Sequence, residues 1–371
     1  MLHGHFEQLK PVCPACRTPE RAHPLAVNRI EAERAGDVAA GILGCPSCGA
    51  EFPIVDGLPI IVPDVRRYIQ ENAFYLLARG DLTPAVESLI GDAAGPNTAV
   101  DSVRQHLSSY AWDHWADCDP LEQRPDAGQV PAPPAPGAIA RTVAAGLATL
   151  PPDLPEGPAL DIGCGGGRSV VELALRSGRT VLGVDISFSL ARLSRGAAVE
   201  RRVSYPRRRV GLVYDRRTFD LTLDLPPAAV DVWICDALAL PFPDRSFALA
   251  TGFNVLDCMS DPRAGLSEIE RVLQPRGATL LSTPFDWSGN VTPSAAWLGG
   301  HSQRGNHDGS AEAVLDMLLS DGPLAVGGLR KFGSVARLPW HVRLHERAFM
   351  HYDAYLITAR KAANPAPPGS E

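Results

Sequence analysis

The residues best suited to chemistry lie in a glycine-rich turn between two apolar runs. Asp161 follows the first run, and the turn after it holds four glycines, Gly163, Gly165, Gly166 and Gly167. Glycine lets a backbone turn sharply and approach a ligand without Cβ clashes. Residues 169–176 then have the pattern of a helix whose first N–H groups would face the same crevice. Asp185 ends the next apolar run, about 20 residues past the glycines, where a carboxylate can accept hydrogen bonds from both ribose hydroxyls.

The turn does not fit dinucleotide binding. The G-x-G-x-x-G fingerprint needs a third glycine at position 168, where this chain has Arg168. Asp161 has no place in that fingerprint, but its carboxylate suits a ligand with an ammonium group, such as S-adenosylmethionine. Asp-x-Gly-x-Gly-x-Gly resembles motif I of the class I S-adenosylmethionine-dependent methyltransferases. The resemblance implies this cofactor and a set of binding residues: Asp161, Gly163, Cys164, Gly165, Gly167, Asp185 and Ile186.

The resemblance continues along residues 151–362. The apolar run 230–235 predicts a strand that ends at Asp236 and Ala237, where the family holds the adenine. The segment 241–247, Pro-Phe-Pro-Asp-Arg-Ser-Phe, matches the family's approach to the next strand, which ends at Asn254. An amphipathic helix over 262–273 and a strand over 278–282 follow. Alternating strands and helices predict an α/β, Rossmann-like parallel sheet with ligands at its carboxyl edge.

Composition and charge agree with an enzyme of this kind. The chain has 371 residues, 45% of them apolar, and a net charge of −7. The negative charge argues against an overall footprint for nucleic acid, although a local basic patch could survive it. There is no apolar run of the ~20 residues that a membrane span needs, and the start of the chain lacks a basic segment followed by an apolar core. We therefore expect a cytoplasmic protein with no membrane partner.

Four of the eight cysteines have the spacing of a metal site, Cys-x2-Cys, x28, Cys-x2-Cys: Cys13, Cys16, Cys45 and Cys48. Each pair predicts a knuckle that aims two thiolates at one tetrahedral ion, for which Zn²⁺ is the first choice and iron an alternative. The segment 50–63 resembles the zinc-ribbon family that includes the activator subunit of tRNA and translation-factor methyltransferases. Arg17 departs from that family's pattern, which commonly has a glycine there. We expect a zinc-ribbon module over residues 1–64.

Residues 65–150 predict a helical connector, with helices at 66–79, 84–90 and 102–115 and a proline-rich linker at 124–137. Tyr110, Trp112 and Trp115 in the third helix could pack in the core or belong to a lid over the cofactor. The tail 363–371 is expected to be disordered.

Two insertions bear on the methyl acceptor. Residues 200–225 hold seven arginines interleaved with aromatic residues, which could bind RNA or form a solvated hairpin. Residues 283–300, with Trp287 and Trp297, resemble the methyltransferase domain of ovothiol biosynthesis, which methylates 4-mercaptohistidine. That resemblance extends to 261–264, 338–343 and Tyr352, but Phe285 replaces a tyrosine. It implies a closed pocket for a small polar molecule, with Trp287, Trp297, His301 and Tyr352 as candidate substrate residues.

The acceptor atom sets the need for a base. An imidazole nitrogen would need no strong base, whereas a hydroxyl or carbon acceptor would. The candidates for a base or an orienting group are five histidines of the last third of the chain: His301, His307, His341, His345 and His351. Three functions stay open. The leading one is a methyltransferase for a small polar metabolite; the others are an RNA or translation-factor methyltransferase docked through the ribbon, and a cofactor-binding scaffold without catalysis.

Overall fold

One mixed sheet of eleven strands organises the described residues, which in this computed structural model are 1–77, 84–122, 134–226 and 228–363. Its strand order is β1-β2-β3-β4-β9-β6-β5-β10-β11-β13-β12. The predicted linker lies largely outside these residues, and so do the end of the first connector helix and nearly all of the tail.

The central five strands are parallel and buried. They are β5 (Ala159–Ile162), β6 (Val181–Asp185), β9 (Val230–Cys235), β10 (Phe247–Phe253) and β11 (Leu273–Thr283). Their sequences are almost continuously apolar, as expected of strands with helices on both faces. One face is covered by α5 (Ala138–Leu147), α6 (Arg168–Ser177) and α7 (Phe188–Ala198), and the other by α8 (Pro262–Val272) and α9 (Ala311–Leu318). All parallel strands therefore point their carboxyl ends at one edge.

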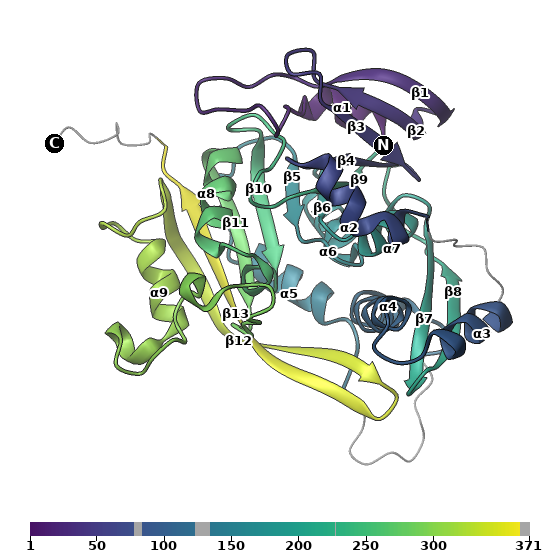
Figure 1. The fold of residues 1–371 in the computed structure, drawn as a ribbon. Coiled ribbons are helices and arrows are strands. Elements are labelled where there is room, and N and C mark those ends of the chain that lie inside the picture. Colours follow the sequence, from purple (N-terminus) through teal and green to yellow (C-terminus); the bar gives the residue numbers. More distant parts are fainter. Residues whose placement is uncertain (78–83, 123–133, 227, 364–371) are drawn as a thin grey trace.

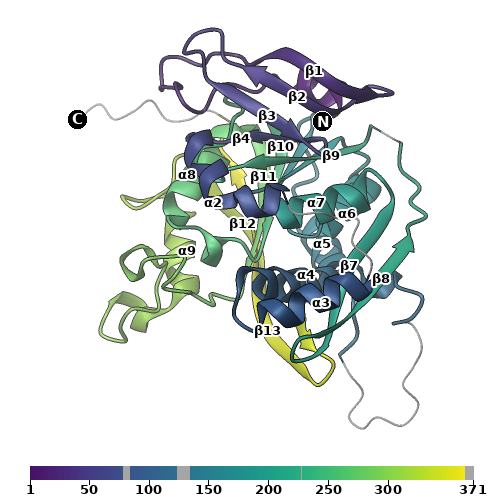
Figure 2. The same cartoon turned by 45° about the vertical axis from the view of Figure 1, so that its right-hand side comes forward.

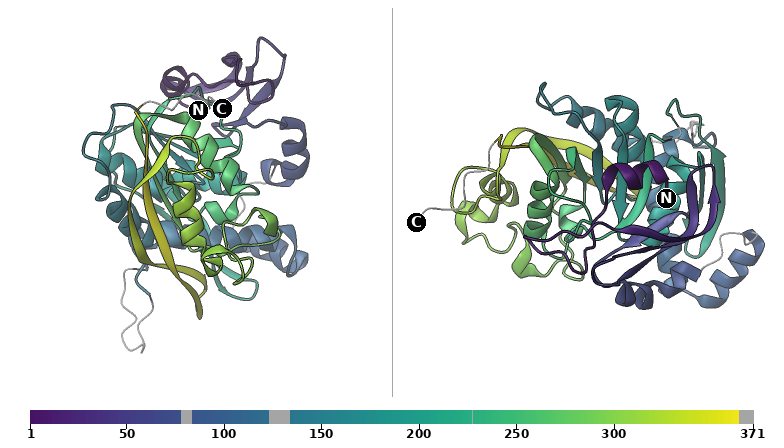
Figure 3. Two further views of the ribbon diagram at one scale, coloured as in Figure 1. Left: turned by 90° about the vertical axis from the view of Figure 1, so that its left-hand side faces the viewer. Right: turned by 90° about the horizontal axis from the view of Figure 1, so that it is seen from above.

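The sheet ends in a long antiparallel hairpin. β13 (Ala348–Lys361) pairs with β11, and β12 (Leu329–His345) pairs with β13. The sequence predicts shorter strands here, at 334–337 and 354–360. In the structure the hairpin continues beyond the other strands as a two-stranded ribbon (Figures 1 and 3). This extension reaches α4 (Ala99–Trp115) and forms a wall beside the carboxyl edge.

The N-terminal cysteine-containing module joins the same sheet. It comprises α1 (His3–Leu9), β1 (Ala26–Arg34), β2 (Asp37–Gly44), β3 (Glu51–Val55) and β4 (Leu58–Ile61). β4 is antiparallel to β3 but parallel to β9, with Ile60 opposite Ile234 and Ile61 opposite Cys235. Figures 1 and 2 show the module across the top of the molecule. Most of its buried apolar side chains belong to the same core cluster as those of α8, whereas Leu58 and Ile60 of β4 belong to the cluster on the other side of the sheet.

The helical connector and the first insertion lie together near the carboxyl edge. α2 (Val65–Leu77) contacts α7, and α3 (Pro84–Ala94) contacts α4. The insertion forms a separate two-stranded hairpin, β7 (Arg202–Val210) and β8 (Val213–Asp220), which packs on α4 (Figure 2). Short 3₁₀ turns complete the chain: η1 (Ala116–Cys118), η2 (Leu256–Cys258), η3 (Ser294–Ala296) and η4 (Asn306–Gly309).

Candidate active site

A cavity of about 670 Å³ lies at the carboxyl edge of the parallel strands. Its floor comes from the residues that follow β5, β6, β9, β10 and β11, its roof from α4, and one wall from the β12–β13 hairpin. This edge is where open parallel α/β sheets bind ligands. Eight predicted residues line the cavity: Gly163, Gly165, Asp185, Ile186, Asp236, Ala237, Asn254 and Tyr352.

The glycine-rich turn is held by hydrogen bonds from both sides. Val184 O accepts from the backbone N–H groups of Gly163 and Cys164, at 2.8 and 3.0 Å. The Asp185 carboxylate accepts from Gly165 N at 2.9 Å and from Ser187 N at 2.8 Å. Burial raises the pKa of Asp185 above its usual value. Gly165 has a φ of +52°, a conformation that favours glycine. The turn therefore fixes the Asp185 carboxylate at the cavity wall.

Asp161 lies beneath the turn and does not line the cavity. Its carboxylate accepts hydrogen bonds from the hydroxyls of Ser169 and Thr251, each at 2.5 Å, and only 1% of its surface is exposed. Burial raises the pKa of Asp161 to about 7 despite these two hydrogen bonds. In this structure Asp161 ties β5 to α6 and β10. Cys164 and Gly167 also lie in this lower layer, beside Ser194.

The residues after β6, β9 and β10 form the end of the cavity next to the cysteine module. Ile186 lies there with its carbonyl accepting from the Tyr68 hydroxyl of α2 at 2.8 Å. Asp236 accepts from Leu238 N at 2.9 Å. Asn254 sits after β10, and its side-chain oxygen accepts from the Ser282 hydroxyl at 2.9 Å. The predicted cofactor residues are thus brought together, and a connector helix closes over them.

Sequence reasoning missed His114, which covers the glycine-rich turn from α4. The backbone N–H groups of Arg168 and Gly166 lie 3.0 and 3.2 Å from its Nδ1 and Nε2. A neutral imidazole accepts at only one nitrogen, and the shorter contact assigns that role to Nδ1. Burial and the nearby Arg168 charge lower the pKa of His114 to about 3, so the ring is neutral. The sequence predicts the helix that carries His114. However, His114 lies far from the glycine-rich motif along the chain, and no local pattern indicates that the two are in contact.

Arg168, which breaks the dinucleotide fingerprint, binds α4 to the turn. Its guanidinium pairs with Asp117 at 2.5 Å and Glu172 at 2.8 Å, and donates to the His114 carbonyl at 3.1 Å. Trp115 Nε1 donates to Gly166 O at 2.7 Å. Of the three aromatic residues singled out in this helix, Tyr110 lines the cavity, whereas Trp112 and Trp115 are buried away from it.

The end of the cavity beyond Asn254 is formed by the hairpin, by α4 and by the segments after β10 and β11. Asp113 of α4 accepts from Trp340 Nε1 at 2.8 Å. Asp257 accepts from the backbone N–H of Asp286 at 2.9 Å, and Asp286 accepts from the Tyr352 hydroxyl at 2.8 Å. Apolar side chains complete this end: Ile139, Val342, Leu344 and Met350.

The other predicted substrate residues lie outside the cavity lining. Trp287 and Trp297 stack with ring centroids 6.1 Å apart, and His301 lies 6.2 Å from Trp297. His341 and His351 form a pair 2.7 Å apart on the hairpin. The histidines that do line the cavity are His106 and His114, both on α4.

The four cysteines of the N-terminal module converge. All of their sulfur atoms lie within 4.8 Å of one another, and the Cys13–Cys48 and Cys16–Cys45 pairs are each 3.7 Å apart. A Zn–S length of about 2.3 Å gives a tetrahedral sulfur–sulfur edge of about 3.8 Å, so the spacing fits one tetrahedral ion. Burial acts to raise the pKa of Cys45, but hydrogen bonds from the backbone N–H groups of Cys48 and Ser47 lower it to about 7.

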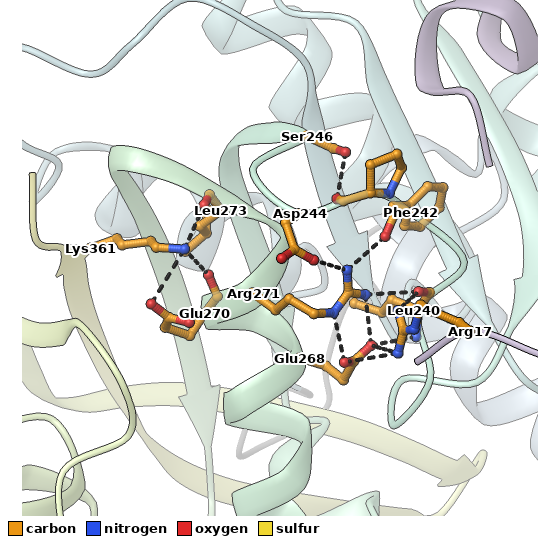
Figure 4. Close-up of polar contacts among 11 residues, drawn as sticks. Arg17, Leu240, Phe242, Asp244, Ser246, Glu268, Glu270, Arg271, Leu273 and Lys361 are labelled. Atoms are coloured by element: carbon orange, nitrogen blue, oxygen red, sulfur yellow. Dashed lines mark hydrogen bonds and ion pairs between the residues drawn. The ribbon is translucent and has the colours of Figure 1, made fainter. Parts of the chain in front are cut away.

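The first knuckle is docked against the loop that carries Asp236. Arg17, the departure from the ribbon pattern, donates to Leu240 O at 2.8 Å and pairs with Glu268 of α8 at 3.1 Å (Figure 4). Glu268 also accepts from Leu240 N and pairs with Arg271, both at 2.8 Å. Val12 N donates to Pro241 O at 2.9 Å. The cysteine module therefore contacts the same loop that supplies Asp236 to the cavity lining.

The arginine-rich hairpin is largely neutralised by partners of its own chain. Five of the seven arginines of residues 200–225 pair with carboxylates: Arg202 with Asp220, Arg207 with Glu122, Arg209 with Asp215 and Glu346, Arg216 with Glu87, and Arg217 with Asp119. Arg208 donates to Gln105 and to Gly211 O, each at 2.9 Å. These contacts attach the hairpin to α3, α4 and the hairpin β12–β13.

Comparison with known proteins gives the same class of domain. Residues 160–281 match the family model described as a methyltransferase domain. Together with the strand order, this match confirms the predicted fold class, a Rossmann-like α/β sheet of the class I methyltransferase type. Within the described residues, no helix is long and apolar enough to cross a membrane.

Similarity to individual proteins is partial. An uncharacterized 37.1 kDa protein in transposon TN4556 of Streptomyces fradiae is 35% identical over 132 residues, 35% of this chain and 30% of that protein. The O-methyltransferase cnsE of Penicillium expansum is 31% identical over 123 residues, 33% of this chain and 36% of that protein. The chain thus spans about a third of the length of these curated relatives.

Among solved structures, a chain in the complex between the Haloferax volcanii Trm112 methyltransferase activator and a methyltransferase is 18% identical. The match covers 60% of this chain and 89% of that chain, with a TM-score of 0.35. Similarity at this level does not bear on function.

Proposed function

We propose that this protein is an S-adenosylmethionine-dependent methyltransferase. The observation that carries the proposal is the carboxyl-edge cavity, where Asp185 is fixed by the glycine-rich turn and Asp236 and Ala237 follow the next strand. The methyltransferase-domain match over the same strands supports it. Asp185 would hold the ribose, and Asp236 and Ala237 the adenine. When bound, the cofactor supplies a methyl group on a sulfonium centre.

The chain's own residues would orient the reactants and exclude water. The turn and the roof helix α4 close the cavity over the cofactor, and positioning of this kind can supply much of the rate of a methyl transfer. His114 stays neutral across the physiological range because its pKa is about 3. It would therefore act as a fixed hydrogen-bonding group above the turn.

A binding titration tests the proposal directly. S-Adenosylhomocysteine is titrated into the full chain by calorimetry, and transfer of radiolabelled methyl groups is then measured against the small-molecule fraction of a cell extract. Saturable binding and label in that fraction are expected. Absence of binding would favour the non-catalytic scaffold and reject the enzyme.

The acceptor is proposed to be a small molecule rather than a macromolecule. The cavity has α4 as its roof and the β12–β13 hairpin as one wall, and its volume of about 670 Å³ suits a compact ligand. For the mercaptohistidine-type acceptor the support is narrower. Of the four candidate substrate residues taken from that resemblance, Tyr352 lines the cavity, whereas Trp287, Trp297 and His301 stack outside it.

The RNA alternative has less support, because the arginines that suggested it are paired within the chain. Paired arginines release few counterions on binding RNA. RNA retention measured between 50 and 200 mM salt is expected to be weak and nearly independent of salt. A steep dependence would restore this alternative, with the cysteine module as a possible docking site.

We also propose that the four cysteines hold Zn²⁺, since their sulfur spacing suits a four-thiolate tetrahedron. Elemental analysis of the purified protein should find one zinc per chain. Iron at that stoichiometry would revise the metal, and no metal would reject the site.

A further inference from the structure

The cavity has a second end whose chemistry differs from the cofactor end. Counting along the sheet, the predicted cofactor residues follow β9, β6, β5 and, with Asn254, β10. The segments beyond Asn254, the segment after β11 and the β12–β13 hairpin carry the rest of the lining. If the cofactor occupies the first end, as the proposed function requires, then the second end is left for the acceptor. No lysine or arginine side chain is among the described residues that line either end.

Asp113 is a buried polar group of the acceptor end. Its side chain comes from α4, and the residue is 5% exposed. One carboxylate oxygen accepts from Trp340 Nε1, while the other is buried with no hydrogen-bond partner among the described residues. The charge of Arg141 acts on this carboxyl group, but the N–H groups of Arg141 are donated to the carbonyls of Pro136 and Ala135.

Asp257, in the 3₁₀ turn after β10, repeats this arrangement. It is 4% exposed, and one of its oxygens accepts from Asp286 N. The other oxygen is also buried without a hydrogen-bond partner within the described part of the chain. Asp286 stands next to it with the Tyr352 hydroxyl bound. The acceptor end therefore carries three carboxyl groups, and among the described residues one oxygen of Asp113 and one oxygen of Asp257 are buried without a hydrogen-bond partner.

A buried acceptor atom without a partner is unfavourable, and a ligand that donates to it recovers that free energy. The surrounding surface of Ile139, Trp340, Val342 and Leu344 favours an apolar body. A ligand carboxylate or phosphate would meet like charge, with no lysine or arginine among the described residues of the lining.

We propose that the acceptor end binds an apolar, ring-sized molecule that carries an amine, with the ammonium N–H groups donated to Asp113 and the acidic wall of Asp257 and Asp286 beside it. This proposal rests on the proposed function and names the class of its acceptor. It assigns Asp113 as a specificity-determining residue, positioned by Trp340.

Three probes that share one ring test the charge preference. Tryptamine, its neutral alcohol analogue indole-3-ethanol, and the anion indole-3-acetate are titrated into the full chain with S-adenosylhomocysteine already saturating. Tryptamine is expected to bind at least about tenfold more tightly than the alcohol, because a charge-assisted hydrogen bond replaces a neutral one. Indole-3-acetate should bind weakest.

Two variants and one control test whether Asp113 causes the preference for the amine. Asp113→Asn should abolish the advantage of tryptamine over indole-3-ethanol while leaving affinity for S-adenosylhomocysteine unchanged, which also shows that the variant is folded. Trp340→Phe removes the donor to Asp113 and should reduce the tryptamine advantage at neutral pH but restore it at higher pH, because burial already raises the pKa of Asp113. Asp220→Asn, on the exposed hairpin, should change nothing.

The outcomes separate the two proposals. Failure of S-adenosylhomocysteine to bind would overturn the proposed function. Normal binding of S-adenosylhomocysteine with equal, absent or anion-preferring binding of the three probes would overturn the amine assignment alone. A tryptamine advantage that survives in Asp113→Asn would also overturn it.

Discussion

The two ends of the cavity satisfy their polar atoms in opposite ways. At the cofactor end the backbone of the turn, Asp185, Asp236 and Asn254 all have hydrogen-bond partners within the protein. At the acceptor end Asp113 and Asp257 each keep one buried oxygen that has no hydrogen-bond partner in the described part of the chain. A satisfied network is rigid and preorganised, whereas an unsatisfied atom makes binding sensitive to the ligand's chemistry. Substitutions at the acceptor end can therefore change specificity while the proposed cofactor site stays intact.

The largest effect should come from a variant that loosens α4, the helix that contributes to both ends of the cavity. Arg168→Met removes the guanidinium that joins Asp117, Glu172 and the His114 carbonyl. Losing one partner of a buried ion pair costs about 3–5 kcal/mol. Urea unfolding should show this loss of stability, and affinity at both ends should fall because α4 carries both His114 and Asp113. Arg202→Met, whose partner Asp220 is exposed, is the matched control. Unchanged stability would mean that α4 is held by other contacts.

Asp185→Ala should lower binding at the cofactor end of the cavity without lowering binding at the acceptor end. It removes the acceptor proposed for two ribose hydroxyls, so affinity for S-adenosylhomocysteine should fall on the order of 100-fold. Asp185→Asn keeps part of the hydrogen bonding to the turn and should lose less. Calorimetric titration measures both. If the alanine variant binds normally while folded, then Asp185 only shapes the turn.

Metal removal should affect the cofactor end more than the acceptor end. Chelation would free the knuckle that holds Leu240 and Pro241, in the loop after Asp236. We expect about a tenfold loss of affinity for S-adenosylhomocysteine, about the worth of one or two hydrogen bonds. Arg17→Met should also lower the affinity for S-adenosylhomocysteine, although this variant retains the metal. Equal affinity with and without metal would show that β4 alone holds the loop.

The smallest effect should be the pH dependence of stability that comes from Asp161, which lies beneath the glycine-rich turn. Folding raises the pKa of Asp161 from 3.8 to about 7, so the folded state holds this proton more tightly than the unfolded chain. The contribution of Asp161 to the free energy of unfolding is complete below its pKa in the unfolded chain. This contribution is lost as the pH rises through its pKa in the folded state. Between pH 5.5 and 6.5 the loss is about 1 kcal/mol. Urea unfolding of Asp161→Asn should lack that part of the slope, and an identical slope would contradict the assignment.

The cofactor end was largely predictable because its residues follow strands that are adjacent in sequence and share one motif. Gly163, Gly165 and Asp185 are close along the chain, and parallel strands bring their carboxyl ends together. The acceptor end has no such signature. Asp113 meets Trp340 across more than two hundred residues, and nothing in the local pattern of either residue encodes the contact. The histidines of the last third were singled out by type alone, whereas His114 acts through the position of its helix.

The pairing of β4 with β9 was equally invisible, because the edge partner of a sheet is chosen by tertiary contacts rather than by local sequence. Its consequence concerns solubility. With β4 in place the backbone of β9 is paired on both sides. A chain that lacks residues 1–64 would expose the unpaired N–H and C=O groups of β9 to solvent. An apolar edge strand of this kind is a template for aggregation. The cysteine module thus serves as the protective border of the sheet.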